Sequence, residues 1–252
     1  MTQAADRDIY RTRIYGAYVT GRNEALAPES VAGLAPRLPY LRWLLHTCMP
    51  KDREADILDI GCGHGAILYA LQQVGYRNAH GVDGSPEQVQ AAARLGIHGV
   101  ALGDLMQTLR DAPDASLDVV IAFDVIEHFT KAELIPLVDE VRRVLKPGGR
   151  WVIHAPNGES PFGNRMQCWD YTHEQAFTHT SLGQLLVASG FTRVEAYEDR
   201  PIPHGFISTV RAALWWLLRA ALLFFVAVET GSFDRRAVFS QNLLAVVYKG
   251  KE

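Results

Sequence analysis

The sequence has few cysteines, no long run of basic residues and no apolar amino terminus. Its three cysteines are odd in number and widely spaced, so neither a disulfide framework nor a CxxC metal site is expected. No basic run exceeds a pair of arginines, and the net charge is −3, which argues against an extended surface for a nucleic-acid backbone. The first residues carry charges such as Asp6, Arg7 and Asp8 where a signal peptide needs an apolar core. We therefore expect a cytoplasmic protein that binds no nucleic acid.

Apolar residues, in contrast, are plentiful. They occupy 48% of the 252 positions, which suits one α/β domain with a sizeable core. We predict a single domain with four parts: a helical cap over 1–55, a core over 56–198, a helical insertion over 199–241, and a last strand and tail over 242–252.

The stretch 56–67 predicts a buried strand, a tight turn and the start of a helix. Apolar residues alternate with acids, then Gly61, Gly63 and Gly65 follow at every second position, and an amphipathic run begins at Ala66. A strand that leads into a helix through such a turn opens a βαβ unit, whose ligands bind beyond the carboxyl ends of the strands. The glycines allow a ligand to approach the backbone closely.

Two classes of ligand use such a loop. The pattern Gly61-x-Gly63-x-x-Ala66, with Asp83 about 20 residues after the loop, satisfies the dinucleotide fingerprint. Asp59, however, lies two positions before the first glycine, where its charge would repel a pyrophosphate at a cost on the order of 1 to 4 kcal/mol. The same carboxylate would attract a ligand with an ammonium and a sulfonium group and no phosphate. S-adenosylmethionine is such a ligand, and we favour it over a nicotinamide cofactor.

Residues 58–65, Leu-Asp-Ile-Gly-Cys-Gly-His-Gly, resemble the first motif of class I S-adenosylmethionine-dependent methyltransferases. Residues 145–149, Leu-Lys-Pro-Gly-Gly, are also similar to this family and extend the resemblance over more than a hundred residues. The resemblance implies an α/β fold with a doubly wound, seven-stranded Rossmann-like sheet, an antiparallel last strand and an N-terminal helical lid. A looser likeness is to bacterial methyltransferases of polysaccharide and natural-product pathways, which implies O-methylation.

The remaining elements are predicted from hydrophobic periodicity and capping signals. Capping boxes are expected at Ser85 with Gln88, Thr130 with Glu133, and Ser181 with Gln184. The expected further strands cover 79–82, 98–102, 117–123, 150–154, 191–197 and 242–248. The expected further helices cover 9–18, 39–49, 130–145 and 181–189.

Several residues are candidates for binding the cofactor. Asp83 ends the second strand, where its carboxylate can accept both ribose hydroxyls, although a solvated strand end has the same appearance. The resemblance implies that Asp104 binds the adenine amino group and that the amide of Leu105 meets the ring; a helix cap is a compatible role for Asp104. The full expected set is Asp59, Gly61, Cys62, Gly63, Gly65, Asp83, Gly84, Asp104, Leu105, Phe123 and, from the lid, Tyr18.

Asp124, Glu127 and His128 follow the fourth strand. If a helical turn begins at Asp124, the three side chains lie on one face, as either a divalent-metal site or a polar substrate pocket. The spacing is similar to the Glu-x-x-Glu-His metal ligands of small-RNA 2′-O-methyltransferases and ubiquinone-pathway O-methyltransferases, with Asp124 in place of the first glutamate. Such ligands would suit magnesium or manganese. Both uses are left open here.

Residues 155–178 show no periodicity and are rich in aromatic residues and histidine, which is typical of a functional loop. Trp169 and Tyr171 could stack on a sugar or aromatic acceptor, whereas His173 and His179 could accept a hydroxyl proton. The alternative is that the aromatic residues only pack the loop against the domain. We predict that His128 or His173 takes the acceptor's proton, while Asp124 and Glu127 orient the acceptor or hold a metal.

Residues 199–241 separate two strands that family members join as a near hairpin. Within them, the apolar stretch 211–229 has 17 residues between its terminal charges, spans roughly 26 Å as a helix and is interrupted by Arg219. This is short of the ~20 apolar residues that a membrane-crossing helix needs. We expect a buried helix over the acceptor pocket or at a homodimer interface. A helix at a membrane surface that presents a lipid-linked acceptor is the alternative.

The predicted reaction is methylation of a hydroxyl on a sugar, a glycolipid or another small molecule. Two other functions remain: a nicotinamide-dependent oxidoreductase, which Asp59 disfavours, and a catalytically silent methyltransferase-like subunit, which would have lost the acceptor groups.

Overall fold

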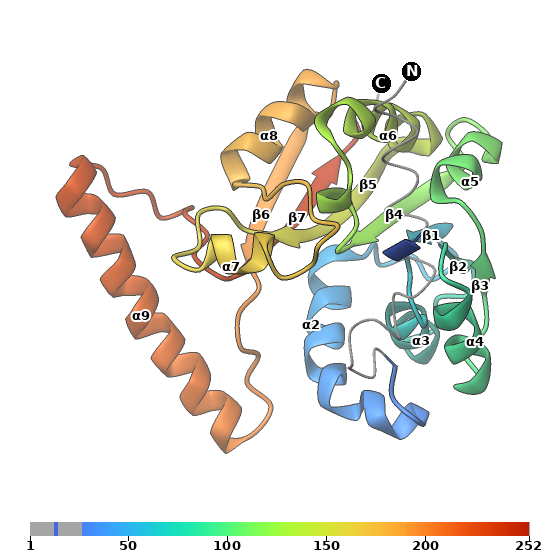
Figure 1. Cartoon of the computed structure of the whole chain (residues 1–252), viewed down its shortest axis with the longest axis horizontal. Coiled ribbons are helices and arrows are strands. Elements are labelled where there is room, and N and C mark those ends of the chain that lie inside the picture. Colours follow the sequence, from blue (N-terminus) through green and yellow to red (C-terminus); the bar gives the residue numbers. More distant parts are fainter. Residues whose placement is uncertain (1–12, 15–26, 252) are drawn as a thin grey trace.

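Parallel strands alternating with helices build the centre of the protein in the computed structural model, which describes residues 13–14 and 27–251 (Figure 1). The strands form one seven-stranded sheet in the order β3-β2-β1-β4-β5-β7-β6, in which β7 is antiparallel to both neighbours. This order and direction confirm the predicted sheet. The strands are β1 (Ile57–Ile60), β2 (Ala79–Asp83), β3 (Val100–Leu102), β4 (Leu117–Phe123), β5 (Leu145–Pro156), β6 (Arg193–Glu198) and β7 (Asn242–Tyr248).

Helices cover both faces of the sheet. One face packs against α2, α3 and α4, and the other against α5, α6 and α8. The helices are η2 (Val31–Arg37), α2 (Leu38–Cys48), α3 (Ala66–Gln73), α4 (Pro86–Arg94), α5 (Leu105–Asp111), η3 (Ile126–His128), α6 (Lys131–Val144), α7 (Gly163–Gln167), α8 (His179–Ala188) and α9 (Phe206–Thr230).

The central strand β4 is buried on both faces. Val119 and Ile121 belong to the core beside α3, whereas Val120 and Ala122 belong to the core beside α6. Successive side chains of a strand point to opposite faces, so a strand between two helical layers needs an apolar residue at every position. This is why the sequence of β4 is largely apolar. The strand was predicted over the same residues as observed.

Two of the three predicted capping boxes differ in the structure. Thr130 and Glu133 form theirs at the start of α6, as predicted. Helix α8 begins two residues earlier than expected because Thr178 is its N-cap and pairs with Ser181. Ser85 precedes α4 but its side chain caps no backbone amide, and its hydroxyl is buried without a hydrogen-bond partner among the residues that the structure describes. Ser85 is therefore available to a ligand.

Strand β5 is longer than predicted. It begins at Leu145, directly after α6, because residues 145–149 continue along the sheet instead of forming a separate turn. The register with β4 shifts between Leu117 and Val119 to accommodate them. Residues 145–149, which resemble a family motif, therefore form the irregular beginning of β5.

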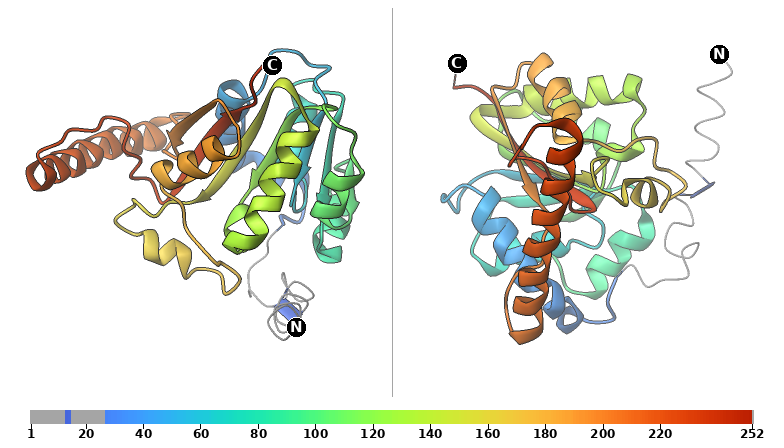
Figure 2. Two further views of the ribbon diagram at one scale, coloured as in Figure 1. Left: turned by 90° about the horizontal axis from the view of Figure 1, so that it is seen from above. Right: turned by 90° about the vertical axis from the view of Figure 1, so that its left-hand side faces the viewer.

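The insertion forms one long helix, α9, that extends away from the rest of the protein (Figure 2). It is longer than the predicted 211–229 because residues 206–210 continue it before Arg211, and it ends at Gly231 in the left-handed conformation. The expectation of a buried helix over the acceptor pocket is wrong. Only Ser208, Ala212 and Leu223 are buried. Within the described chain, α9 is the helix whose length and composition would allow it to cross a membrane, and 11% of its most apolar window is buried.

Candidate functional site

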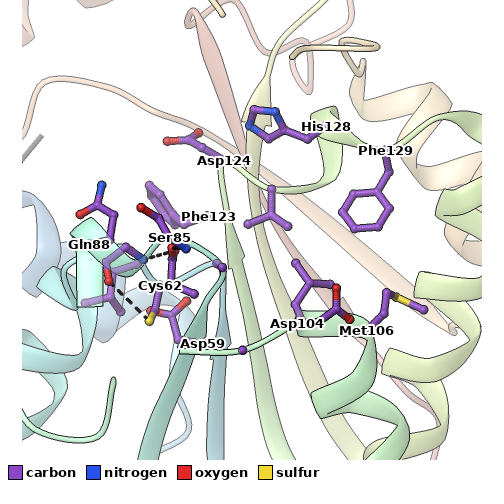
Figure 3. A pocket seen from close by; sticks show the side chains of 18 of the residues that line it. Asp59, Cys62, Ser85, Gln88, Asp104, Met106, Phe123, Asp124, His128 and Phe129 are labelled. Carbon is purple, nitrogen blue, oxygen red and sulfur yellow. Dashed lines mark hydrogen bonds between the residues drawn. The ribbon is translucent and has the colours of Figure 1, made fainter. Parts of the chain in front are cut away.

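A cavity of about 840 Å³ opens at the carboxyl ends of β1, β2, β3 and β4 (Figure 3). This is the edge of the sheet at which ligands of doubly wound folds bind. Most of the predicted cofactor residues line it: Asp59, Gly61, Cys62, Gly63, Asp83, Gly84, Asp104, Leu105 and Phe123. Tyr18 and most of the helix predicted over 9–18 lie outside the described residues.

The loop after β1 needs its glycines for two different reasons. Gly61 has φ +67°, and a Cβ there would lie 2.6 Å from Cγ2 of Val125, so a side chain is excluded by both conformation and space. Gly65, with φ +78°, does not line the cavity. Its added Cβ would lie 2.9 Å from methyl groups of Ile97 and Val100. Gly65 therefore allows close packing under the loop, and its contact with the cofactor stays a prediction.

Asp59 is the most buried acid of the cavity wall. Its side chain is 1% exposed, and neither carboxylate oxygen has a hydrogen-bond partner among the described residues. Burial raises the pKa of Asp59 well above its ordinary value, and the charge of Asp83 raises it further. A buried carboxylate without partners is costly, and a cation is the partner that would restore its charged form. The position suits an ammonium group and disfavours a phosphate.

Asp83 connects the glycine loop to the end of the second strand through hydrogen bonds. Its Oδ2 accepts a hydrogen bond from the amide of Gly63 at 2.8 Å, and its Oδ1 accepts one from the amide of Ser85 at 2.8 Å. Burial raises its pKa, while these two bonds act in the opposite direction. Each oxygen has a second lone pair, so the carboxylate can also accept the two hydroxyls of a ribose. Asp104 caps α5 through the amide of Gln107 at the cavity wall, which agrees with the cap role foreseen for it.

Asp124 does not begin a helical turn. It has φ +56°, and the turn η3 starts two residues later, so Asp124 does not share a face with Glu127 and His128. Its Oδ1 instead accepts a hydrogen bond from Nδ1 of His154 at 2.6 Å, while Nε2 of His154 lies 3.3 Å from Oδ2 of Asp199. The predicted set of Asp124, Glu127 and His128 is therefore divided between two clusters.

His154 is charged in this arrangement. Its side chain is 4% exposed and its ring stacks on Phe123, with centroids 4.0 Å apart. Burial opposes the charge, but the carboxylates of Asp124 and Asp199 outweigh burial and raise the pKa of His154 to about 10. The same pairing outweighs the burial of Asp124 and lowers its pKa. The imidazolium thus fixes the half-exposed carboxylate of Asp124 at the cavity wall.

Glu127, His128 and His173 form the second cluster, in which one ligand atom of each lies within 4.8 Å of the others. Glu127 is fully buried, and its carboxylate oxygens have no hydrogen-bond partner in the described chain, although Nε2 of His173 lies 3.9 Å from Oε1. The rings of His128 and His173 meet edge to face at 4.8 Å. Only His128 of the three also lines the cavity.

The tautomer of His128 follows from its neighbours. The hydroxyl of Thr172 donates to Oδ1 of Asp170 at 2.8 Å, so at 2.8 Å from Nδ1 of His128 it can only accept. This places the ring proton on Nδ1 and makes Nε2 the basic nitrogen. Burial lowers the pKa of His128 to about 4, and the charge of His173 contributes in the same direction. The ring is therefore a neutral proton acceptor at physiological pH.

The other loop residues lie away from the cavity wall. Trp169 and Tyr171 are 54% and 82% exposed, and His179 lies 3.0 Å from Glu159 in the first turn of α8. Polar residues that were not predicted to bind the cofactor also line the cavity, among them Arg37, His64, Ser85 and Gln88.

The fold and this cavity define a class I methyltransferase. A crystal structure of a methyltransferase from Archaeoglobus fulgidus matches with a TM-score of 0.59 at 22% identity, over 86% of this chain and 93% of that one. The 1,6-didemethyltoxoflavin-N1-methyltransferase of Burkholderia thailandensis, solved with S-adenosylhomocysteine, matches with a TM-score of 0.57 at 18% identity, over 99% and 91%. Residues 35–196 match a methyltransferase domain family, and the chain belongs to that family. Its cofactor is S-adenosylmethionine.

Curated relatives carry several substrates in their names. A probable S-adenosylmethionine-dependent methyltransferase of Mycolicibacterium smegmatis is 32% identical over 149 residues, which is 59% of this chain and 54% of that protein. The ubiquinone biosynthesis O-methyltransferase of Xylella fastidiosa is 30% identical over 41% of this chain and 42% of that protein. The human probable tRNA methyltransferase 9B is 35% identical over 46% and 26%. The chain thus spans about half or less of these relatives, and the absence of nucleic-acid binding stays a prediction.

Proposed function

We propose that the protein transfers the methyl group of S-adenosylmethionine to a hydroxyl oxygen of a small-molecule or glycan acceptor, with His128 taking the hydroxyl proton. The observation that carries this proposal is the position of a neutral imidazole in the wall of the cofactor cavity, with its Nδ1 bound to Thr172. Nε2 is then the nitrogen with which it can accept a proton.

The cofactor residues support the same reading. Asp59 would hold the ammonium group of the methionine part, and Asp83 would hold the ribose. The ligand would pack against the backbone of the glycine loop, which carries no side chains at the glycine positions. When bound, S-adenosylmethionine supplies a methyl group on a positively charged sulfur. The acceptor oxygen forms the new bond to carbon as the carbon–sulfur bond breaks, and the hydroxyl proton passes to His128. Because the positive charge passes from the sulfur to the imidazole along with the transferred proton, and no anion has to be stabilised, alignment of the acceptor is the main task of the protein.

The segment 157–178, between β5 and α8, supports a sugar or another ring-bearing acceptor. Phe162, Trp169 and Tyr171 are each more than half exposed there, and Thr172 from the same segment contacts His128. Exposed aromatic rings on this segment provide stacking faces for a ring-bearing acceptor. The name of the Xylella relative, an O-methyltransferase, agrees with oxygen as the acceptor atom.

The direct test is transfer from labelled cofactor. The full chain is incubated with S-adenosylmethionine carrying an isotopically labelled methyl group and a metabolite extract, and mass spectrometry identifies the labelled products. We expect labelled methyl ethers. Labelled amines or tRNA as the main products would replace the proposed acceptor class, and bound cofactor without any product would favour a catalytically silent subunit.

Asp59→Asn is expected to weaken binding of S-adenosylhomocysteine by about 10- to 100-fold, since a hydrogen bond to a charged group contributes about 1.5–3 kcal/mol. Calorimetry measures the affinity, and Asp139→Asn, on the exposed surface of α6, is the matched control. In a thermal-shift experiment the wild type should be stabilised by S-adenosylhomocysteine and not by NADH. Equal affinity in the two variants would remove Asp59 from the cofactor site.

The cluster of Glu127, His128 and His173 could instead hold a divalent ion. Magnesium requires near-octahedral oxygen coordination, and this cluster offers one carboxylate and two imidazoles, because Asp124 is paired with His154. We therefore expect EDTA to change turnover by less than about twofold. Loss of activity with EDTA that manganese restores in the wild type, and not in Glu127→Gln, would assign the cluster to a metal.

A further inference from the structure

The polarity of α9 is inverted relative to a helix on the surface of a soluble domain. Large apolar side chains on its outward face are more than half exposed: Leu214, Leu217, Leu218, Phe224, Phe225 and Val228. The polar groups turn inward, where Nε of Arg219 donates to Oε1 of Glu198 at 2.9 Å and Nε1 of Trp215 donates to Oε2 at 2.7 Å. A soluble helix places these two faces the other way round. Exposed apolar surface of this extent marks a contact with a membrane or a partner.

The connections of α9 exclude a simple crossing of the membrane. Glu198 at the end of β6 pairs with Leu243 of β7, so the chain leaves the sheet and returns to it at the same place. If α9 crossed, residues 231–241 would have to return through the hydrocarbon without forming a helix, carrying Asp234, Arg235 and Arg236. Backbone groups without partners and unpaired charges are not tolerated there. If α9 contacts a membrane, only an orientation in the plane of the membrane surface keeps both of its connections to the sheet on the same side.

Charge indicates the kind of surface. Residues 199–241 contain five arginines and three acidic residues, whereas the whole chain has a net charge of −3. Arg200 lies over the ring of Trp216, 5.5 Å from its centroid, and Arg235 and Arg236 follow the helix and are exposed. Cationic side chains that flank an apolar helix face attract anionic headgroups while the apolar side chains enter the acyl region.

We propose that α9 docks the protein onto a bilayer with anionic headgroups, lying in the plane of the interface with its outward face in the acyl region. The inward face stays on the domain through Arg219 and Trp215. Residues 199–205 and 231–241 remain on the side of the membrane that holds the domain.

Docking through α9 would also determine where the cofactor cavity lies relative to the membrane surface. Strand β6 runs parallel to β5, since both are antiparallel to β7, so α9 departs from the edge of the sheet where the cavity opens. The contact between Asp199 and His154 joins the start of this insertion to the wall of the cavity through Asp124. Resting on the proposed function, this geometry would favour acceptors carried by lipids. Docking itself is measured without cofactor or acceptor, so the two can fail separately.

The test is co-sedimentation of the full chain with vesicles. We expect binding to vesicles of phosphatidylcholine with phosphatidylglycerol, weaker by about tenfold or more with phosphatidylcholine alone and reduced by salt. Leu217→Glu, at a side chain 69% exposed on α9, should lower binding by about tenfold or more. Val187→Glu, at a side chain 58% exposed on α8, is the matched control and should leave it unchanged. Retained binding of S-adenosylhomocysteine shows that both variants fold.

Other outcomes would overturn the proposal. Equal binding to both kinds of vesicle would exclude the anionic headgroups, and equal binding of Leu217→Glu and Val187→Glu would exclude α9. If the protein sediments as a dimer that Leu217→Glu dissociates, and does not bind vesicles, the outward face of α9 would be a contact with a second copy of the chain. Trypsin added outside sealed vesicles should cut after Arg236; protection there until detergent is added would indicate a crossing helix.

Discussion

His128→Ala is expected to lower kcat for methyl transfer to a hydroxyl by about 10²- to 10⁴-fold, the usual contribution of a positioned proton acceptor. The ring lies in the cavity wall, and its Nδ1 is tied to the loop that is expected to receive the acceptor. Since none of the atoms proposed to hold the cofactor belongs to His128, affinity for S-adenosylhomocysteine should change by less than about twofold. Single-turnover kinetics with a labelled acceptor measure the loss.

The pH profile gives this expectation a second readout. The pKa of His128 is lowered to about 4, so its neutral, proton-accepting form dominates above that value. Wild-type kcat should therefore stay level from about pH 5 to 8 and fall only toward pH 4. His98→Ala, on the exposed surface before β3, is the control for loss of an imidazole. If His128→Ala turned over at the rate of the control, the proton would have to leave by another route, with His173 the next group to test.

Much of the cofactor side of the cavity could be predicted because its signals are local. Asp59 and the glycines lie within seven residues of the chain, and the strand-turn-helix pattern alone places them at the carboxyl edge of the sheet. Asp83 follows by the same rule from the next strand. Buried groups such as Ser85 and Gln88 were attributed to a capping box, since the sequence cannot tell a cap from a ligand-facing hydroxyl.

The acceptor side could not be predicted in the same way because its contacts are distant in sequence. His154 lies 30 residues from Asp124 and 45 from Asp199, and the left-handed conformation of Asp124 decides which of its neighbours it meets. His154 lies near the carboxyl end of β5 and Asp199 follows β6, both at the carboxyl edge, which is the one signal that could have drawn attention to them. For α9, composition predicted the helix correctly but not its exposure. The burial of a helix depends on whether other elements of the fold pack against it, and these contacts are distant in sequence.

His154→Gln is expected to cost about 2–4 kcal/mol of unfolding free energy at neutral pH. The substitution removes the cation between Asp124 and Asp199 and the stack on Phe123. Breaking a buried ion pair costs about 3–5 kcal/mol, and the lower range reflects the 56% exposure of Asp124, whose charge water can screen. Urea unfolding measures the difference, with His46→Gln, exposed on α2, as the matched control.

The dependence of this cost on pH has a definite sign. Folding raises the pKa of His154 from 6.5 to about 10, so the folded state binds the proton more tightly than the unfolded state. The stabilisation is complete below the unfolded value and is lost as pH rises toward 10, at up to about 1.4 kcal/mol per pH unit. The wild type and His154→Gln should therefore converge in stability across this interval, while the wild type and His46→Gln keep a constant difference. Parallel curves for wild type and His154→Gln would mean that the imidazole is neutral in the folded protein, and that Asp124 is held by hydrogen bonding without a cation.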